Sequence, residues 1–283
     1  MQYDPIKRSL GEVFDKSPFL RILFYKLLDL LLLRAWHIQK ELRKWAKARK
    51  NSVSRYHKVH ILDAGAGFGQ YTHYLSGMNR SWNILAVDVK KEQVSDCNNF
   101  FRRAGRKSVL FKIANLTTFR MQDTFDLILS VDVMEHIKED NAVFKNFYES
   151  LKEEGMLLIS TPSDKGGSDV HADGATSFIE EHVRNGYNRT SLRDQLYAAG
   201  FSKVESHYSY GIPGKISWLL SMKYPILMLG AGKVFFILLP FYYLIIYPIC
   251  FVLNYFDLTI KWRTGTGLIV KAWRLTPRFS EGG

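Results

Sequence analysis

Residues 61–75 read ILDAGAGFGQYTHYL, and this stretch is the most informative about the fold. An apolar run ends near Asp63 and is followed by glycines at every second position, Gly65, Gly67 and Gly69, before a segment typical of a helix start. Glycines after a buried strand let a ligand approach the backbone, and the next helix presents unpaired N–H groups toward it. The stretch therefore predicts a strand, a ligand-binding loop and a helix.

Short apolar runs alternate with amphipathic helical stretches around this loop. The runs are VHILDAG (59–65), NILAVDV (83–89), VLFKIAN (109–115), FDLILSV (125–131), GMLLIST (155–161), KVESHYS (203–209) and, after a long interruption, GLIVKAW (267–273). This alternation is typical of a parallel sheet wound with helices. We predict an α/β fold with a doubly wound sheet.

The glycine spacing distinguishes between nucleotide ligands. Nicotinamide-binding loops have the spacing G-x-G-x-x-G, whereas here Gln70 follows Gly69 and the spacing is G-x-G-x-G. The loop therefore argues against a dinucleotide. Asp88 lies 19 residues past Gly69, at the end of the next run, where a carboxylate can accept both hydroxyls of a ribose. An ordinary acid at a strand end is the alternative for Asp88.

Residues after the third and fourth runs complete the expected nucleotide site. Asn115 is placed to bond an adenine amino group, with Phe111 and Leu116 flanking the ring. Ser130, near the end of the fourth run, is assigned to the same ligand.

Together these residues resemble the class I S-adenosylmethionine-dependent methyltransferases. DAGAGFG (63–69) resembles their acid-G-x-G-x-G loop, VD (87–88) their ribose acid, and FDLILSVDVMEHI (125–137) their fourth conserved block. The resemblance covers about 58–211 and the run at 267–273, and it departs at Asn115, where many members have Asp. It implies a Rossmann-like sheet of seven strands with the last antiparallel. It also implies that S-adenosyl-L-methionine binds over the glycines, with Asp63 oriented toward the loop or the cofactor ammonium.

A second group follows the fourth run. Asp132, Glu135 and His136 stand at i, i+3 and i+4, which on a helix would bring them to one face and could hold Mg²⁺. The element resembles the E-x-x-E-H motif of ubiquinone-pathway O-methyltransferases and small-RNA end methyltransferases, and His182 resembles a further ligand in these families. In many methyltransferases, however, this Glu and His only line the pocket. Glu135, His136 and His182 are also our candidates for catalysis, because a hydroxyl acceptor needs a base.

The first 50 residues predict an amphipathic, basic helical segment. Residues 18–36 are mostly apolar, and Arg21, Lys26 and Asp29 fall on one side of a helix, within an arc of roughly 140°. Residues 34–50 carry seven Lys or Arg and one acid. We expect this segment to lie on a surface with its bases beside lipid headgroups. A nucleic acid, or no partner at all, is the alternative.

An apolar insert separates the sixth and seventh runs. Residues 234–256, VFFILLPFYYLIIYPICFVLNYF, contain no charge, and about 20 apolar residues can cross a bilayer. Pro240 and Pro248 would each remove a helix hydrogen bond, so we favour a re-entrant or interfacial helical hairpin over a true span. A buried subdomain or dimer interface is the alternative. In the family sheet this connection leaves the carboxyl edge, so the insert would face the active-site mouth.

We therefore divide the chain into a basic helical segment (1–50), a cofactor-binding core (51–211), a hydrophobic insert (212–265) and a last strand with a tail (266–283). The expected function is methyl transfer to a hydrophobic, lipid-like acceptor at a membrane. RNA end methylation is an alternative that leaves the insert without a purpose, so nucleic acid is not the expected partner. A non-catalytic scaffold is a second alternative. Cys97 and Cys250 form no disulfide framework, and the cytoplasmic side of the membrane fits best.

Overall fold

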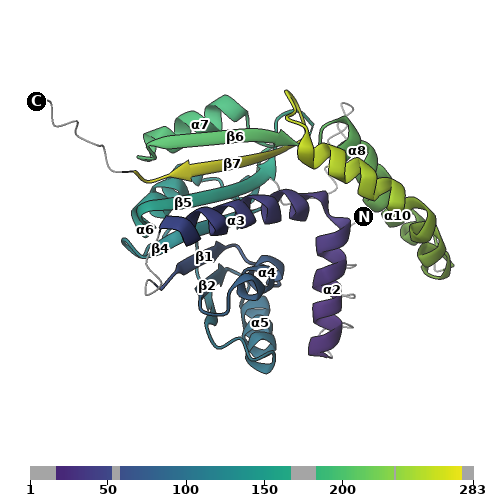
Figure 1. Ribbon diagram of the computed structural model, residues 1–283, viewed down its shortest axis with the longest axis horizontal. Coiled ribbons are helices and arrows are strands. Elements are labelled where there is room, and N and C mark those ends of the chain that lie inside the picture. The colour runs from purple at the N-terminus through teal and green to yellow at the C-terminus, as the bar shows by residue number, and fades with distance from the viewer. Residues whose placement is uncertain (1–16, 53–57, 167–182, 233, 276–283) are drawn as a thin grey trace, which may run out of the picture.

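A seven-stranded sheet forms the centre of the molecule in the computed structural model, which describes residues 17–52, 58–166, 183–232 and 234–275 (Figure 1). The strands are β1 (His60–Ala64), β2 (Asn83–Asp88), β3 (Val109–Ile113), β4 (Phe125–Val131), β5 (Leu151–Pro162), β6 (Lys203–Ser209) and β7 (Gly267–Trp273). Their order is β3-β2-β1-β4-β5-β7-β6, with β7 antiparallel to both of its neighbours. The predicted Rossmann-like sheet and its antiparallel last strand are confirmed.

The strands coincide with the apolar runs except at β5. This strand begins at Leu151, before the apolar run at 155–161, because Leu151 pairs with Phe125 across an irregularity in the β4–β5 ladder. Glu154 has a φ of +61° within the same stretch. The start of β5 is therefore determined by pairing with β4 and not by the hydrophobicity of its own residues.

Helices cover both faces of the sheet, as Figure 1 shows. They are α3 (Leu33–Ser52), α4 (Gln70–Met78) and α5 (Lys91–Arg103) on one face, and α6 (Asp140–Ser150) and α7 (Arg189–Ala198) on the other. Ile61 and Leu127 pack toward the first group, and Leu62 and Ile128 toward the second. The alternation along each strand therefore fills two apolar layers.

The N-terminal segment differs from its prediction. It forms two helices, α2 (Pro18–Leu31) and α3, which are separated at Leu32, where the backbone is extended. The side chains of Ala35, Ile38 and Leu42 are fully buried against the sheet. Helix α3 is thus part of the core, because its apolar residues complete a face that the strands leave open.

The basic run on α3 is not a free cationic surface. Arg34 pairs with Asp132, and two further bases pair with acids, Lys44 with Glu41 (2.7 Å) and Arg49 with Asp126 (2.5 Å). The Lys40 ammonium donates to the carbonyl of Leu258. These side chains have partners within the protein, although Lys44 is still 59% exposed, and the expectation that the run lies beside lipid headgroups stays a prediction.

The insert between β6 and β7 is an antiparallel pair of helical segments. One arm runs through α8 (Ile212–Trp218), a π-helical turn η2 (Leu219–Lys223) and α9 (Tyr224–Ala231), and α10 (Phe235–Thr259) returns along it. Helix α10 continues through Pro240 and Pro248, which were expected to interrupt it. In Figure 1 the pair extends away from the carboxyl edge of the sheet. The predicted hairpin shape is present, although its relation to a membrane is a separate question.

Candidate active site

Three glycines shape the loop between β1 and α4. Gly65, Gly67 and Gly69 have φ angles of +77°, +53° and +84°, in the left-handed region that favours glycine. A Cβ on Gly65 would lie 2.4 Å from Cγ2 of Val133, and one on Gly69 would lie 3.0 Å from Phe101. At Gly67 no described atom lies within 4 Å of the Cβ position. The loop is therefore packed on two sides and open at its centre, as a cradle for a ligand must be.

Asp63 supports this loop from below. Its side chain is 2 % exposed, and its Oδ2 accepts a 2.5 Å hydrogen bond from the Thr72 hydroxyl on α4. Burial raises the pKa of Asp63 to about 6, a change that the Thr72 hydrogen bond opposes and the charge of Asp88 reinforces. Because a nearby positive charge would lower this pKa, the carboxyl group suits a cationic ligand. Asp63 bonds α4 just after the loop, and its orientation toward the loop or the cofactor ammonium stays a prediction.

Asp88 lies at the end of β2, beside the loop. Its Oδ2 accepts from the amide of Gly67 and its Oδ1 from the amide of Lys90, both at 2.9 Å. The side chain is only partly buried, so the remaining lone pairs can accept further hydrogen bonds. Asp88 thus holds the open glycine in place in addition to its predicted contact with a ribose.

The residues assigned to the adenine lie in different environments. The Asn115 side-chain oxygen accepts from the amide (3.0 Å) and hydroxyl (2.9 Å) of Thr117, so this oxygen already caps a local turn. Leu116 is 5 % exposed and belongs to the core below the sheet, and Phe111 packs on Phe101 with 5.2 Å between ring centroids. A base could therefore rest on the outer edges of these side chains but not between their faces.

Ser130 has the environment expected of a residue with a missing partner. It is fully buried near the end of β4, and its hydroxyl finds no hydrogen-bond partner among the described residues. A buried hydroxyl of this kind normally binds protein or water. Together with the open side of Gly67, it indicates that the carboxyl ends of β1 and β4 fit a nucleoside ligand.

The D-x-x-E-H group does not lie on one face of an α-helix, which corrects our prediction. Asp132 has a φ of +52°, and the following turn, η1 (Met134–His136), is a 3₁₀ helix. Asp132 pairs with Arg34, while Glu135 is 1 % exposed and accepts from the Thr161 hydroxyl at 3.1 Å. The backbone turns sharply after β4 because the Asp132 amide donates back to the carbonyl of Ser160 on β5.

The predicted magnesium site finds no support in this geometry. Among the described residues, no three His, Cys, Asp or Glu side chains lie close enough together to hold a metal ion. Glu135 faces Thr161, and Asp132 is neutralised by Arg34, so the two carboxylates have different partners. His182, the proposed further ligand and second candidate base, lies outside the described residues. We assign no step to a metal.

Glu135 and His136 remain together at the carboxyl edge. Burial raises the pKa of Glu135 above its ordinary value, and the hydrogen bond from Thr161 and the nearby charges of His136 and Arg34 oppose that rise. The Glu135 carbonyl also accepts from the amide of Val183 at 3.1 Å, which fixes the turn. A buried carboxyl group thus lies next to a half-buried imidazole, and both are side chains of the type that accepts a proton in general base catalysis.

Three site residues escaped the sequence analysis: Arg34, Tyr71 and Tyr210. The Arg34 amide donates to the hydroxyl of Tyr210 at 3.1 Å, and its Nε donates to the hydroxyl of Tyr71 at 3.4 Å. Burial raises the pKa of Tyr210 to about 12, so its hydroxyl stays neutral at physiological pH. The sequence held one signal for Arg34, which is the first base of the run 34–50 and directly follows an apolar stretch.

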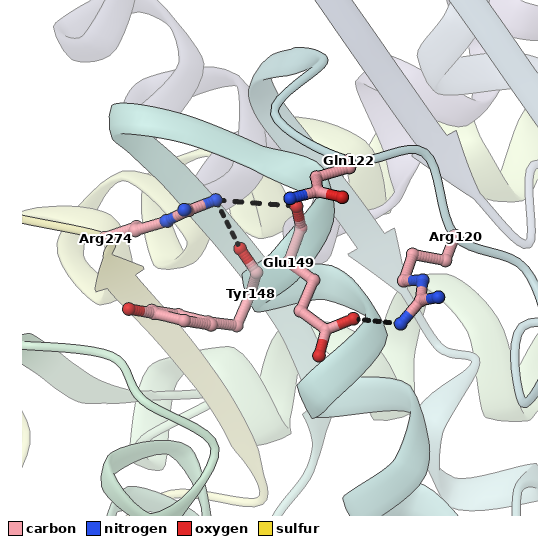
Figure 2. Close-up of a pocket in the computed structure, with 5 residues that line it drawn as sticks. All are labelled: Arg120, Gln122, Tyr148, Glu149 and Arg274. Atoms are coloured by element: carbon pink, nitrogen blue, oxygen red, sulfur yellow. Dashed lines mark hydrogen bonds and ion pairs between the residues drawn. The ribbon is translucent and has the colours of Figure 1, made fainter.

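A different hollow, drawn in Figure 2, lies at the opposite edge of the sheet. It is lined by Arg120, Gln122, Tyr148, Glu149 and Arg274, and its volume is about 280 Å³. The guanidinium of Arg120 pairs with Glu149 at 2.6 Å, and that of Arg274 donates to main-chain carbonyls and lies over the ring of Tyr148. Both arginines that line the hollow are thus bonded to other groups of the protein. The hollow lies at the amino ends of the strands, away from the glycine loop.

Comparisons with known proteins agree with the geometry. A family model described as a methyltransferase domain matches residues 56–197. The chain is 25% identical over 149 residues to malonyl-[acyl-carrier protein] O-methyltransferase of Bacillus cereus, an alignment that covers 53% of each protein. It is 35% identical over 146 residues to phosphoethanolamine N-methyltransferase 1 of Triticum aestivum, covering 51% of this chain and 28% of that protein.

The fold has close counterparts among solved structures. Phosphoethanolamine N-methyltransferase 2 of Haemonchus contortus, in complex with phosphomonomethylethanolamine and S-adenosylhomocysteine, superposes with a TM-score of 0.58 at 15% identity. The match covers 83% of this chain and 53% of that one. This chain thus spans about half the length, or less, of the relatives it matches. The likeness to this structure concerns the fold.

Proposed function

Because this chain belongs to the class I S-adenosylmethionine-dependent methyltransferases, we propose that it transfers a methyl group to a hydrophobic, lipid-like acceptor at a membrane surface. The glycine loop, Asp63, Asp88 and the unpartnered Ser130 hydroxyl support binding of S-adenosylmethionine. The relatives above methylate different acceptors, so the acceptor has to be inferred from what is particular to this chain. That feature is the apolar insert.

The observation that carries the proposal is the inverted polarity of α10. Its three buried residues are Cys250, Asn254 and Asp257, whereas Leu244 and Ile245 on the outer side are 75% and 69% exposed. A helix on a water-soluble protein buries its apolar stripe. The reverse arrangement suits a helix that packs by its polar side and faces hydrocarbon with the other.

Length and burial support the same conclusion. Within the described part of the chain, α10 is the one helix long and apolar enough to cross a membrane, and 6% of its most apolar 18 residues are buried. A core helix of a soluble protein would pass the test of length but would be mostly buried. An exposed apolar surface of this extent marks a membrane or protein contact. We propose on this basis that the chain contacts a membrane, and we keep the cytoplasmic side that the sequence favours.

Asp257 connects the insert to the site. It is fully buried and accepts hydrogen bonds from the amides of Gly211 (2.7 Å) and Tyr210 (3.1 Å), and its Oδ1 lies 2.9 Å from Nε2 of His37. The end of α10 is therefore attached to the carboxyl end of β6. Tyr210 in turn bonds Arg34, which pairs with Asp132 beside the candidate base. An acceptor that leaves the bilayer along the insert would reach this cluster first.

We infer that the acceptor atom is a hydroxyl oxygen, as in the ubiquinone-pathway enzymes that the D-x-x-E-H element resembles. When bound, S-adenosylmethionine supplies the methyl group: the C–O bond forms as the C–S bond breaks and its electron pair goes to sulfur. Glu135 or His136 accepts the proton of the hydroxyl, and Thr161 orients Glu135. The remaining residues position the acceptor in line, which is the main contribution an enzyme makes to methyl transfer.

Extraction after incubation with labelled S-adenosylmethionine and a membrane fraction tests this proposal. Label in the organic phase supports it. Label in RNA would favour RNA end methylation, and no label in any product would favour a non-catalytic scaffold. The pairing of Arg34, Lys44 and Arg49 within the protein leaves RNA fewer cationic contacts than the sequence suggested.

Liposome flotation tests the membrane contact separately. The double variant Leu244→Glu with Ile245→Glu on α10 should float less than the wild type, while binding S-adenosylmethionine equally well in detergent. Leu110→Glu is the matched control, because Leu110 is an apolar side chain that is 50% exposed on the edge strand β3. A wild-type protein that is soluble without detergent and ignores liposomes would contradict the membrane contact.

A further inference from the structure

Helix α2 turns its apolar side outward. Phe19 is 72% exposed, and Leu23, Leu27 and Leu30 are 41%, 39% and 42% exposed. These four residues, which we call the outer face of α2, share one side of the helix at 100° per residue. Lys26 lies among them and is exposed as well. A contiguous exposed apolar face of this kind marks a contact with a protein or a membrane.

The opposite side of α2 is polar and holds the glycine loop. The Phe68 carbonyl, between Gly67 and Gly69, accepts from the Arg21 guanidinium at 3.0 Å and from the Tyr25 hydroxyl at 2.5 Å. Arg21 is 6% exposed and Tyr25 is fully buried. Charged donors to a buried carbonyl are worth more than neutral ones. Two side chains from one helix therefore hold the loop that cradles the cofactor.

Two further contacts extend this attachment. The Arg21 guanidinium lies 3.1 Å from Sγ of Cys97, and that thiol contacts the Gly67 carbonyl at 3.6 Å. At the other end of the loop, the Gln70 side-chain amide donates to Asp29 at 2.8 Å. Arg21, Tyr25 and Asp29 thus attach α2 to the glycine loop and to the start of α4. A shift of α2 would move this loop.

The C-terminal end of α2, at Leu30, contacts α10. The Tyr247 hydroxyl on α10 donates to the carbonyl of Leu30 at 3.2 Å, and the Trp36 indole donates to the same carbonyl at 3.0 Å. Figure 1 shows both helices beyond the carboxyl edge of the sheet. One bilayer surface would therefore meet α10 and the outer face of α2 together, and Lys26 would face its headgroups.

We propose that the outer face of α2 binds an anionic lipid bilayer and that this contact holds the glycine loop in its cofactor-binding conformation. Attachment to the membrane then raises the affinity for S-adenosylmethionine, and by linkage the cofactor strengthens attachment by the same factor. The inference rests on the membrane contact of the proposed function but needs neither the acceptor nor turnover. In solution the outer face meets water whether or not α2 is docked on the loop, so the bilayer contact is the additional stabilisation of the docked helix.

Calorimetric titration with S-adenosylhomocysteine tests the proposal. The full chain is compared in a neutral detergent and in vesicles of phosphatidylcholine with phosphatidylglycerol. The variants are Leu23→Glu with Leu27→Glu, and the matched control Leu23→Met with Leu27→Met. Leu, Met and Glu are all good helix formers, so the two pairs differ in polarity and not in helicity. Neither side chain contributes to the contacts with Phe68.

The wild type and the Met pair should bind at least about fivefold more tightly in vesicles, a change of about 1 kcal/mol. The Glu pair should lose that gain while still floating through α10. Flotation without any gain in the wild type overturns this inference and leaves the proposed membrane contact intact, as does an equal gain in the Glu pair. A wild type that does not float overturns both.

Discussion

Replacing Gly67 by alanine tests whether the open side of the glycine loop holds the cofactor. Gly67 has a φ of +53°, and a Cβ there would meet no described atom within 4 Å. The substitution therefore adds backbone strain of about 1–2 kcal/mol but no clash within the protein. A ligand resting on the loop would overlap the new methyl group, at about 1–3 kcal/mol for an overpacked contact. That range corresponds to about 5- to 150-fold in Kd.

Gly105 provides a matched control. Its φ is +69°, no described atom lies within 4 Å of its Cβ position, and it follows α5 at the amino edge of the sheet. Gly67→Ala and Gly105→Ala should lower the free energy of unfolding, measured by denaturant, by similar amounts. Calorimetry with S-adenosylmethionine should then show weaker binding for Gly67→Ala alone. A folded Gly67→Ala protein with wild-type affinity, or an equal loss in Gly105→Ala, would refute the assignment of the loop.

Three further predictions concern protons, the base and the metal. Burial raises the pKa of Asp63 to about 6, so the native state holds a proton that the unfolded state releases near the ordinary aspartate pKa of 3.8. Stability of the cofactor-free protein should therefore fall by up to about 3 kcal/mol as the pH rises between these values. Denaturant curves of Asp63→Asn should lack this slope, and an unchanged slope would show that another group causes it. Glu135→Gln and His136→Ala should lose turnover but keep their affinity for S-adenosylmethionine, measured by calorimetry, because they serve the acceptor. Weaker cofactor binding in both would place them in the cofactor site instead. EDTA should leave turnover unchanged, and a loss that Mg²⁺ restores would reinstate the metal.

The strands and the glycine loop could be read from the sequence because their signals are local. The apolar runs at 83–89 and 125–131 became β2 and β4, since a buried strand needs apolar side chains wherever it lies. The glycines at 65, 67 and 69 likewise need left-handed backbone for reasons internal to the loop. The antiparallel direction of the last strand followed from the family resemblance and not from the runs themselves.

The D-x-x-E-H group shows where local spacing fails. A spacing of i, i+3 and i+4 brings side chains together only if the backbone is α-helical, and here Asp132 is left-handed and the next turn is 3₁₀. The long-range bond from the Asp132 amide to Ser160 and the pairing with Arg34 decide that conformation. Both partners come from segments far away in the chain, so no pattern within residues 132–136 contains them.

The N-terminal helices show the same division. The sequence by itself determined that residues 18–31 have a polar side and an apolar side, because periodicity fixes which residues share a helix face. The sequence does not say which side faces the protein. In the fold Arg21 and Tyr25 point inward to the Phe68 carbonyl, and Phe19 is left exposed. The rotation of a helix about its axis is set by the acceptors that its hydrogen-bond donors meet in the folded protein. Those acceptors belong to a loop more than 40 residues further along the chain.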